Sequence, residues 1–188
     1  MTATTAVVLL ALFALEGLTL VRINSRSMLT AHVVVGMVLV PPVLVKVGST
    51  SWRFVRYYTR HPAYRRRGTP PPLLRVLGPL LVVLTVVLLA SGVLLMLLNG
   101  QVRTTLLTVH KVSFVLWFVV MIVHVLGHIA EVSRIAPRDF VARTRRQVRG
   151  ASLRVWLVSS SLVVGIVLGA AIEPRIGPWL ASGGIYPR

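Results

Sequence analysis

Cysteine is absent from this chain, and acidic residues are scarce. The 188 residues include 4 Asp and Glu against 21 Lys and Arg, which gives a formal net charge of +17. The absence of thiols excludes disulfides, thiolate metal sites, iron–sulfur clusters and covalent c-type haem attachment. Any haem must therefore be held by histidine or methionine. The sequence also shows no flavin or dinucleotide fingerprint and no soluble domain.

Hydrophobic residues form 55% of the chain and come in long blocks. Five blocks are long enough, or nearly so, to cross a membrane, at about residues 5–21, 29–47, 77–98, 105–132 and 153–172. Blocks of this kind do not suit a soluble core. The sequence predicts an all-α integral membrane protein, with a single membrane domain over residues 1–188 and five transmembrane helices in contact with membrane lipid.

The positive charge gathers in two basic connections between these blocks, 48–76 and 133–152. The first contains Arg53, Arg56, Arg60, Arg65, Arg66, Arg67 and Arg75, and the second, with the start of the last block, contains Arg134, Arg138, Arg143, Arg145, Arg146, Arg149 and Arg154. The positive-inside rule places such connections in the cytoplasm and explains the charge without a nucleic-acid partner. We therefore expect a bacterial cytoplasmic membrane, a cytoplasmic N-terminus and a C-terminus outside.

Three local patterns refine the expected helices. Aromatic residues alternate with arginines over residues 51–64, which is typical of a segment lying among lipid headgroups. Pro41 and Pro42 predict a kink in the second helix. Gly165 and Gly169 predict a small-residue stripe at which the fifth helix packs closely against a neighbour.

Histidine is the residue type that points to chemistry. His110, His124 and His128 lie on one stripe of the fourth block, because a helix turns about 100° per residue. His32 lies near the start of the second block and His110 near the start of the fourth, on helices expected to run in the same direction. Their depths therefore match, and ligating side chains inside a membrane are usually functional. Two imidazoles at one depth predict the axial ligands of a b-type haem inside a four-helix core.

Gly36 and three arginines are expected to surround this haem. Gly36 follows His32 by about one helical turn, which leaves room for the edge of a porphyrin. Arg22, Arg26 and Arg103 lie in the turns expected outside, against the positive-inside bias. Their guanidinium groups are expected to meet haem propionates through charge-assisted hydrogen bonds.

In layout the chain resembles the cytochrome b subunits of membrane formate dehydrogenases and nickel–iron hydrogenases, together with their four-helix relatives. In that family the fourth helix carries two haem-ligating histidines about fourteen residues apart, and the second helix supplies the partner of the outer one. The resemblance implies that His32 and His110 hold an outer haem and that His124 stands at the position of the inner ligand. The family's helix-1 partner for that inner ligand is missing, because residues 6–21 contain no histidine.

The inner end leaves three alternatives for His124 and His128. A second haem would need another partner, such as His61 from the connection 48–76. Alternatively, His124, His128 and Glu131 form an i, i+4, i+7 stripe, which allows proton exchange with a quinone headgroup. The same spacing would also suit a divalent metal ion.

Glu16 lies within the first apolar block, in the half expected to be near the outer surface. Its carboxyl group would then take part in proton transfer from a quinol, or pair with an outer arginine. The alternative is that the side chain snorkels or forms a hydrogen bond with a serine.

These features together predict a membrane b-type cytochrome, which is an electron-transfer subunit rather than a stand-alone enzyme. It would pass electrons between a separate redox subunit and the quinone pool, with the 99–104 turn and the tail 173–188 as an outer docking surface. The competing prediction is a non-redox membrane transporter or assembly subunit whose histidines handle protons or metal ions.

Overall fold

The protein is described by a computed structural model, which covers residues 3–59, 72–98, 100–140 and 151–181. Its side chains are described over residues 5–59, 75–98, 100–127, 153 and 155–181. The helices in these ranges are α1 (Ala3–Thr19), η1 (Leu20–Arg22), α2 (Arg26–Tyr58), α4 (Pro72–Leu97), α5 (Gln101–Phe140) and α7 (Ala151–Ala181).

In the described part of the chain, five helices are long and apolar enough to cross a membrane. The candidate spans are Thr5–Arg22, Arg26–Tyr58, Arg75–Leu97, Gln101–Gly127 and Val155–Ala181. Helices satisfy their own backbone hydrogen bonds, which a bilayer requires of any spanning segment. The predicted all-helical integral membrane fold with five spans is confirmed.

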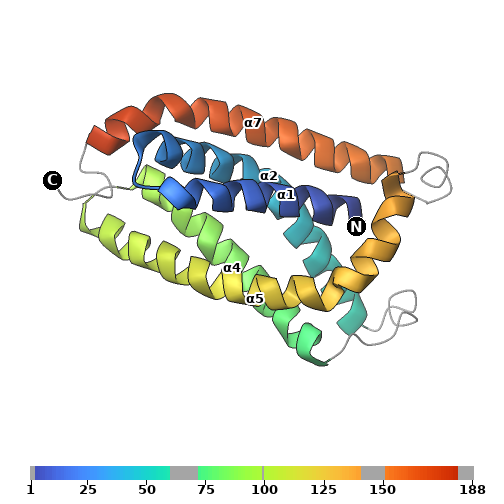
Figure 1. Ribbon diagram of the computed structural model, residues 1–188. Coiled ribbons are helices and arrows are strands. Elements are labelled where there is room, and N and C mark those ends of the chain that lie inside the picture. Colours follow the sequence, from blue (N-terminus) through green and yellow to red (C-terminus); the bar gives the residue numbers. More distant parts are fainter. Residues whose placement is uncertain (1–2, 60–71, 99, 141–150, 182–188) are drawn as a thin grey trace.

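Several helices continue beyond the ends expected from the apolar blocks. α2 runs through Pro41 and Pro42 to Tyr58, so the first part of the expected headgroup segment belongs to this helix. α7 runs through Pro174 and Pro178 to Ala181, so the start of the expected C-terminal tail is helical as well. The length of an apolar block indicates how much of a helix can lie in the bilayer, not where the helix begins and ends. A proline bends a helix, but the hydrogen bonds on either side of it remain. Figure 1 shows the second half of α2 turning away from α1.

Two short turns lie at one end of the bundle, which we call the short-turn end. The first begins after η1, where Ser25 caps α2 by accepting a hydrogen bond from the backbone N–H of Met28 at 3.2 Å. The second joins α4 to α5 through Gly100, whose φ of 78° favours glycine. The C-terminal end of α7 lies at this same end (Figure 1).

The helices pack mainly as two pairs, α2 with α7 and α4 with α5. α1 lies against α2 and also reaches α5. The predicted glycine stripe explains the close fit of α7, because a Cβ atom at Gly165 would overlap the carbonyl oxygen of Val38, and one at Gly169 would lie 3.2 Å from that of Val34. The four helices α1, α2, α4 and α5 therefore enclose a common space, and α7 covers α2 from outside.

Candidate functional site

A cavity of about 840 Å³ lies among α1, α2, α4 and α5. This volume falls within the range of ligand-binding pockets. Most of the lining is apolar, and its hydrogen-bonding side chains other than tryptophan are Glu16, Asn24, His32, His110 and Lys111. The cavity therefore brings the predicted histidine pair into one mostly apolar space.

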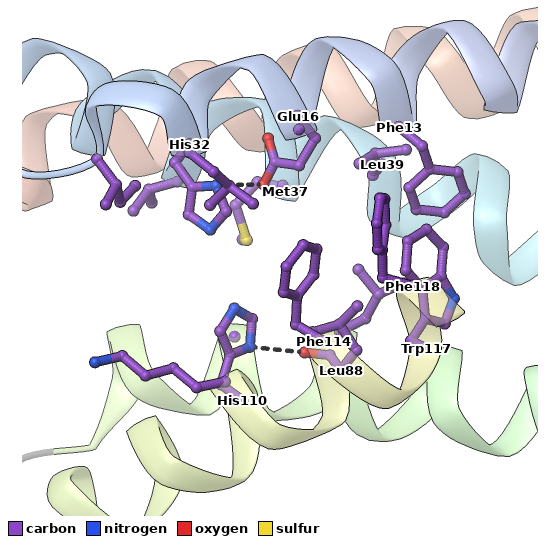
Figure 2. A pocket seen from close by; sticks show the side chains of 18 of the residues that line it. Phe13, Glu16, His32, Met37, Leu39, Leu88, His110, Phe114, Trp117 and Phe118 are labelled. Atoms are coloured by element: carbon purple, nitrogen blue, oxygen red, sulfur yellow. Dashed lines mark hydrogen bonds and ion pairs between the residues drawn. The ribbon is translucent and has the colours of Figure 1, made fainter. Parts of the chain in front are cut away.

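His32 on α2 and His110 on α5 face each other across this cavity. Their ring centroids lie 6.2 Å apart, and the ring planes are nearly perpendicular, at 79°. Figure 2 shows the second ring nitrogen of each histidine, the one outside the marked contacts, turned toward the gap between them. The two histidines expected at matching depths thus have imidazole rings that face each other.

Two side chains of the α1 end hold the His32 ring. Its Nδ1 atom lies 2.9 Å from Oε1 of Glu16 and 3.0 Å from Oγ1 of Thr19. The Thr19 hydroxyl donates its proton to the backbone carbonyl of Glu16 at 2.5 Å, so its oxygen accepts toward the histidine. Both partners are therefore satisfied by an N–H at Nδ1, which leaves the Nε2 lone pair of His32 for the cavity.

An equivalent arrangement on α4 holds the His110 ring. Its Nδ1 atom lies 3.1 Å from the carbonyl oxygen of Leu88 and 3.1 Å from Oγ of Ser91. The Ser91 hydroxyl donates to the same Leu88 carbonyl at 2.9 Å, and so it too accepts from the histidine. Thr19 and Ser91 thus play the same part on two helices, and each fixes an N–H at Nδ1 of its histidine.

Glycines on α2 and α4 make room for these contacts. A Cβ atom at Gly36 would lie 3.2 Å from Oε1 of Glu16, and one at Gly92 would lie 3.1 Å from Cε1 of His110. Gly36 lines the cavity as expected, but the group close to it is the Glu16 carboxylate, which reaches past it to His32. Gly92, rather than Gly36, lies directly against a histidine ring, and no pattern in the sequence distinguishes it from other glycines.

The donor set and its spacing fit haem. A metal–nitrogen bond of about 2.0 Å, with about 1.1 Å from nitrogen to ring centre, places the centroids of two imidazoles on opposite sides of one ion about 6 Å apart. Among the residues with described side chains, no group of three or more His, Cys, Asp or Glu is placed to hold a metal ion. Two imidazoles therefore suit an ion that brings further ligands with it, as haem iron brings its porphyrin nitrogens.

The second hydrogen bond of each ring also fits a ligand role. Metal-ligating histidines almost always donate their other N–H to a carboxylate, a backbone carbonyl or water, which orients the ring. His32 has a carboxylate in this position and His110 has a backbone carbonyl.

The three arginines expected around the haem do not line the cavity. Arg22 and Arg26 are exposed at the short-turn end. Arg103 is buried, with its guanidinium carbon 4.2 Å from the ring centroid of Trp179 and its Nη2 3.4 Å from the Trp179 carbonyl oxygen. Since Trp179 itself lines the cavity, Arg103 contacts a residue of the cavity wall and does not reach the interior. Lys111, next to His110, is the basic side chain that does line the cavity among the described residues.

Among the residues expected at the inner end, only His124 has a described side chain. It is half-buried on α5 and does not line this cavity. His128 and Glu131 belong to α5, but their side chains lie outside the described residues, and His61 lies outside them altogether. Glu16 pairs with His32 rather than with an arginine or a serine, and its expected part in proton transfer stays a prediction.

Sequence reasoning missed Thr19, Ser91, Gly92, Lys111 and Trp179. Small hydroxyl residues and glycines are frequent in membrane helices, so no local pattern separates these positions from the many structural ones. Their importance follows from their positions around the histidines, and only the folded structure shows those positions. The chain matches no family model, no curated protein and no solved structure, so the geometry of the histidine pair carries the functional argument.

Proposed function

We propose that this protein is a membrane b-type cytochrome that binds one haem between His32 and His110 and transfers electrons. The observation that carries the proposal is the pair itself. Two imidazoles meet across an apolar cavity with their centroids 6.2 Å apart, and each has its Nδ1 atom engaged by an acceptor. This leaves both Nε2 atoms as the ligands.

The roles of the chain's own residues follow from these contacts. Haem iron, when bound, supplies one-electron chemistry. His32 and His110 hold the iron, while Glu16 and the Leu88 carbonyl orient their rings and select the tautomer. The apolar lining excludes water from the site.

The proposal extends to orientation and partners. The basic connections 48–76 and 133–152 favour a cytoplasmic position, and we infer that the short-turn end and the histidine pair lie near the outer face of a bacterial cytoplasmic membrane. An electron-transfer subunit of this size, with no second redox cofactor motif in its sequence, works between a separate redox subunit and the quinone pool.

Absorbance spectroscopy of the detergent-purified protein tests the proposal. We expect a Soret band and a reduced α-band of low-spin haem, with about one haem per chain. His32→Gly and His110→Gly should each abolish the low-spin signal, and added imidazole should restore it by filling the space of the missing ring. His124→Ala is the matched control, since it removes a histidine from α5 that does not line the cavity.

Two results would overturn the assignment. One is colourless protein from cells with ample haem supply. The other is a low-spin spectrum that survives in both the His32 and the His110 variants. Rescue by imidazole separates loss of a ligand from loss of the fold, because a misfolded variant does not regain the spectrum.

A further inference from the structure

The cavity is closed on one side and open on the other. Its lining residues on α2 and α4 are all buried or half-buried. On α1 and α5, by contrast, Leu10, Phe118, Ile122 and Leu126 line the cavity while exposing 49%, 50%, 43% and 63% of their surface. Ala14 and Gly17 are likewise exposed lining residues on α1. An opening between α1 and α5 therefore leads into the cavity.

This opening lies within the membrane. Its residues belong to the candidate spans Thr5–Arg22 and Gln101–Gly127. Gly17 neighbours Glu16, the partner of His32, so the opening begins at the level of the histidine pair. A molecule that passes through it comes from the hydrocarbon region of the bilayer rather than from water.

The wall beside the opening is aromatic. Phe114 and Phe118, one helical turn apart on α5, stack with ring centroids 5.8 Å apart and planes at 29°. Both line the cavity, and Phe13 and Trp117 meet next to them with centroids 4.7 Å apart. Figure 2 shows this cluster beside the gap between His32 and His110. Such a wall offers flat faces to a ring-shaped ligand.

Beyond the aromatic wall the cavity continues as an apolar lobe. It follows α5 from Phe118 to Leu126, a length of about 12 Å at about 1.5 Å per residue. Met121, Ile122 and Val125 line this lobe, and Leu10 and Val40 face it from α1 and α2. The lobe therefore suits a long hydrocarbon chain and offers no hydrogen-bonding side chain for a charged headgroup among the described residues.

We propose that the opening between α1 and α5 is a binding site for a prenylated quinone that enters from the bilayer. The flat head lies against Phe114 and Phe118 beside the histidine pair, and the chain lies in the lobe and the opening. This inference rests on the proposed haem function, which gives a quinone at this place an electron-transfer partner. A phospholipid fits less well, because its charged headgroup belongs at the membrane surface, whereas this opening lies within the span.

Quinone analysis of the purified protein tests the site. Solvent extraction followed by chromatography and mass spectrometry measures the ratio of quinone to haem, which we expect to be about one. Ala14→Trp fills the opening and should lower this ratio at least about fivefold at unchanged haem content. Ala11→Trp is the matched control, because Ala11 is exposed on α1 but does not line the cavity.

A second pair of variants tests the aromatic wall without adding bulk. Phe118→Ala should weaken the binding of decyl-benzoquinone, followed by quenching of tryptophan fluorescence, by about tenfold. Leu116→Ala should leave it unchanged, because Leu116 is comparably exposed on α5 but lies outside the lining. If Ala14→Trp also loses haem, its ratio of quinone to haem no longer reports on the opening alone. The Phe118→Ala result then decides whether the quinone site exists.

The outcomes separate the two proposals. Wild-type protein that contains haem but neither retains quinone nor binds decyl-benzoquinone overturns the quinone site and leaves the haem assignment intact. Equal losses in the lining variants and their controls overturn it as well. An extract that contains only phospholipid, or a haem that itself carries the hydrocarbon chain, identifies a different occupant and also overturns it. Absence of haem from wild-type protein overturns the proposed function directly.

Discussion

Oε1 of Glu16 lies 2.9 Å from Nδ1 of His32, whereas Nδ1 of His110 faces the neutral carbonyl oxygen of Leu88 at 3.1 Å. The two histidines of the pair therefore differ in the charge of their partners. A carboxylate that accepts from the N–H of a ligand makes the imidazole more basic, and hydrogen bonding of this kind is one way in which a protein tunes haem iron.

Replacing Glu16 by glutamine should raise the reduction potential of the proposed haem. Glutamine keeps a hydrogen-bond acceptor near Nδ1 of His32 but removes the negative charge that favours the oxidised iron. We expect the reduction equilibrium to change by about tenfold, or about 59 mV for one electron, in a spectroelectrochemical titration. Glu173→Gln, which removes the same charge from an exposed position on α7, should leave the potential unchanged. Equal shifts in both variants would contradict a role through His32.

Replacing Gly92 by valine should displace the His110 ring. Even the Cβ atom at this position would lie 3.1 Å from Cε1 of His110, and the larger side chain cannot avoid the ring. Haem retention should fall on the order of tenfold, as for other changes that disturb the support of a metal ligand. Dilution into apomyoglobin measures this loss. Gly78→Val on the same helix is the control, since nothing lies within 4 Å of the Cβ position there. Similar haem loss from both variants would show that α4 itself is disturbed.

Replacing Gly165 by alanine should separate α7 from α2. The new Cβ atom would overlap the carbonyl oxygen of Val38, a backbone atom that cannot move without its helix. We expect a loss of about 1–3 kcal/mol in the free energy of unfolding, measured by denaturant titration in detergent micelles. Gly48→Ala on α2 meets nothing within 4 Å and should be neutral or slightly stabilising. An unchanged stability of Gly165→Ala would mean that α7 does not pack tightly at this position.

Replacing Trp179 by alanine should open the wall of the cavity at the short-turn end. The indole donates to the carbonyl oxygen of Leu95 at 2.9 Å and carries the Arg103 guanidinium on its ring. Loss of a buried tryptophan costs about 3–5 kcal/mol, and the exposed cavity should release haem faster. Trp156→Ala is the control, because Trp156 lies on the same helix with 73% of its surface exposed. Equal rates of haem release from the two variants would contradict a closing role for Trp179.

The sequence was sufficient to predict the membrane fold and the facing of His32 and His110, because both follow from helical periodicity and span length. It could not predict the contacts of Glu16, since a carboxylate's partner depends on which helix packs beside it. The expectation that Arg103 surrounds a haem stays a prediction. The sequence could not show that the Arg103 side chain packs on Trp179 in the cavity wall. α7 reaches Trp179 only because the helix continues through Pro174 and Pro178, and apolar block length does not reveal this.

The division of the bundle into α2 with α7 and α4 with α5 has a consequence for biogenesis. Each pair buries its own contacts, and α7 must be synthesised before α2 obtains its full partner. If the cavity holds the proposed haem, the two pairs can pack in the bilayer before the haem enters the space between them. On the proposed function, a shortage of haem would then leave a folded chain that can still take up its cofactor.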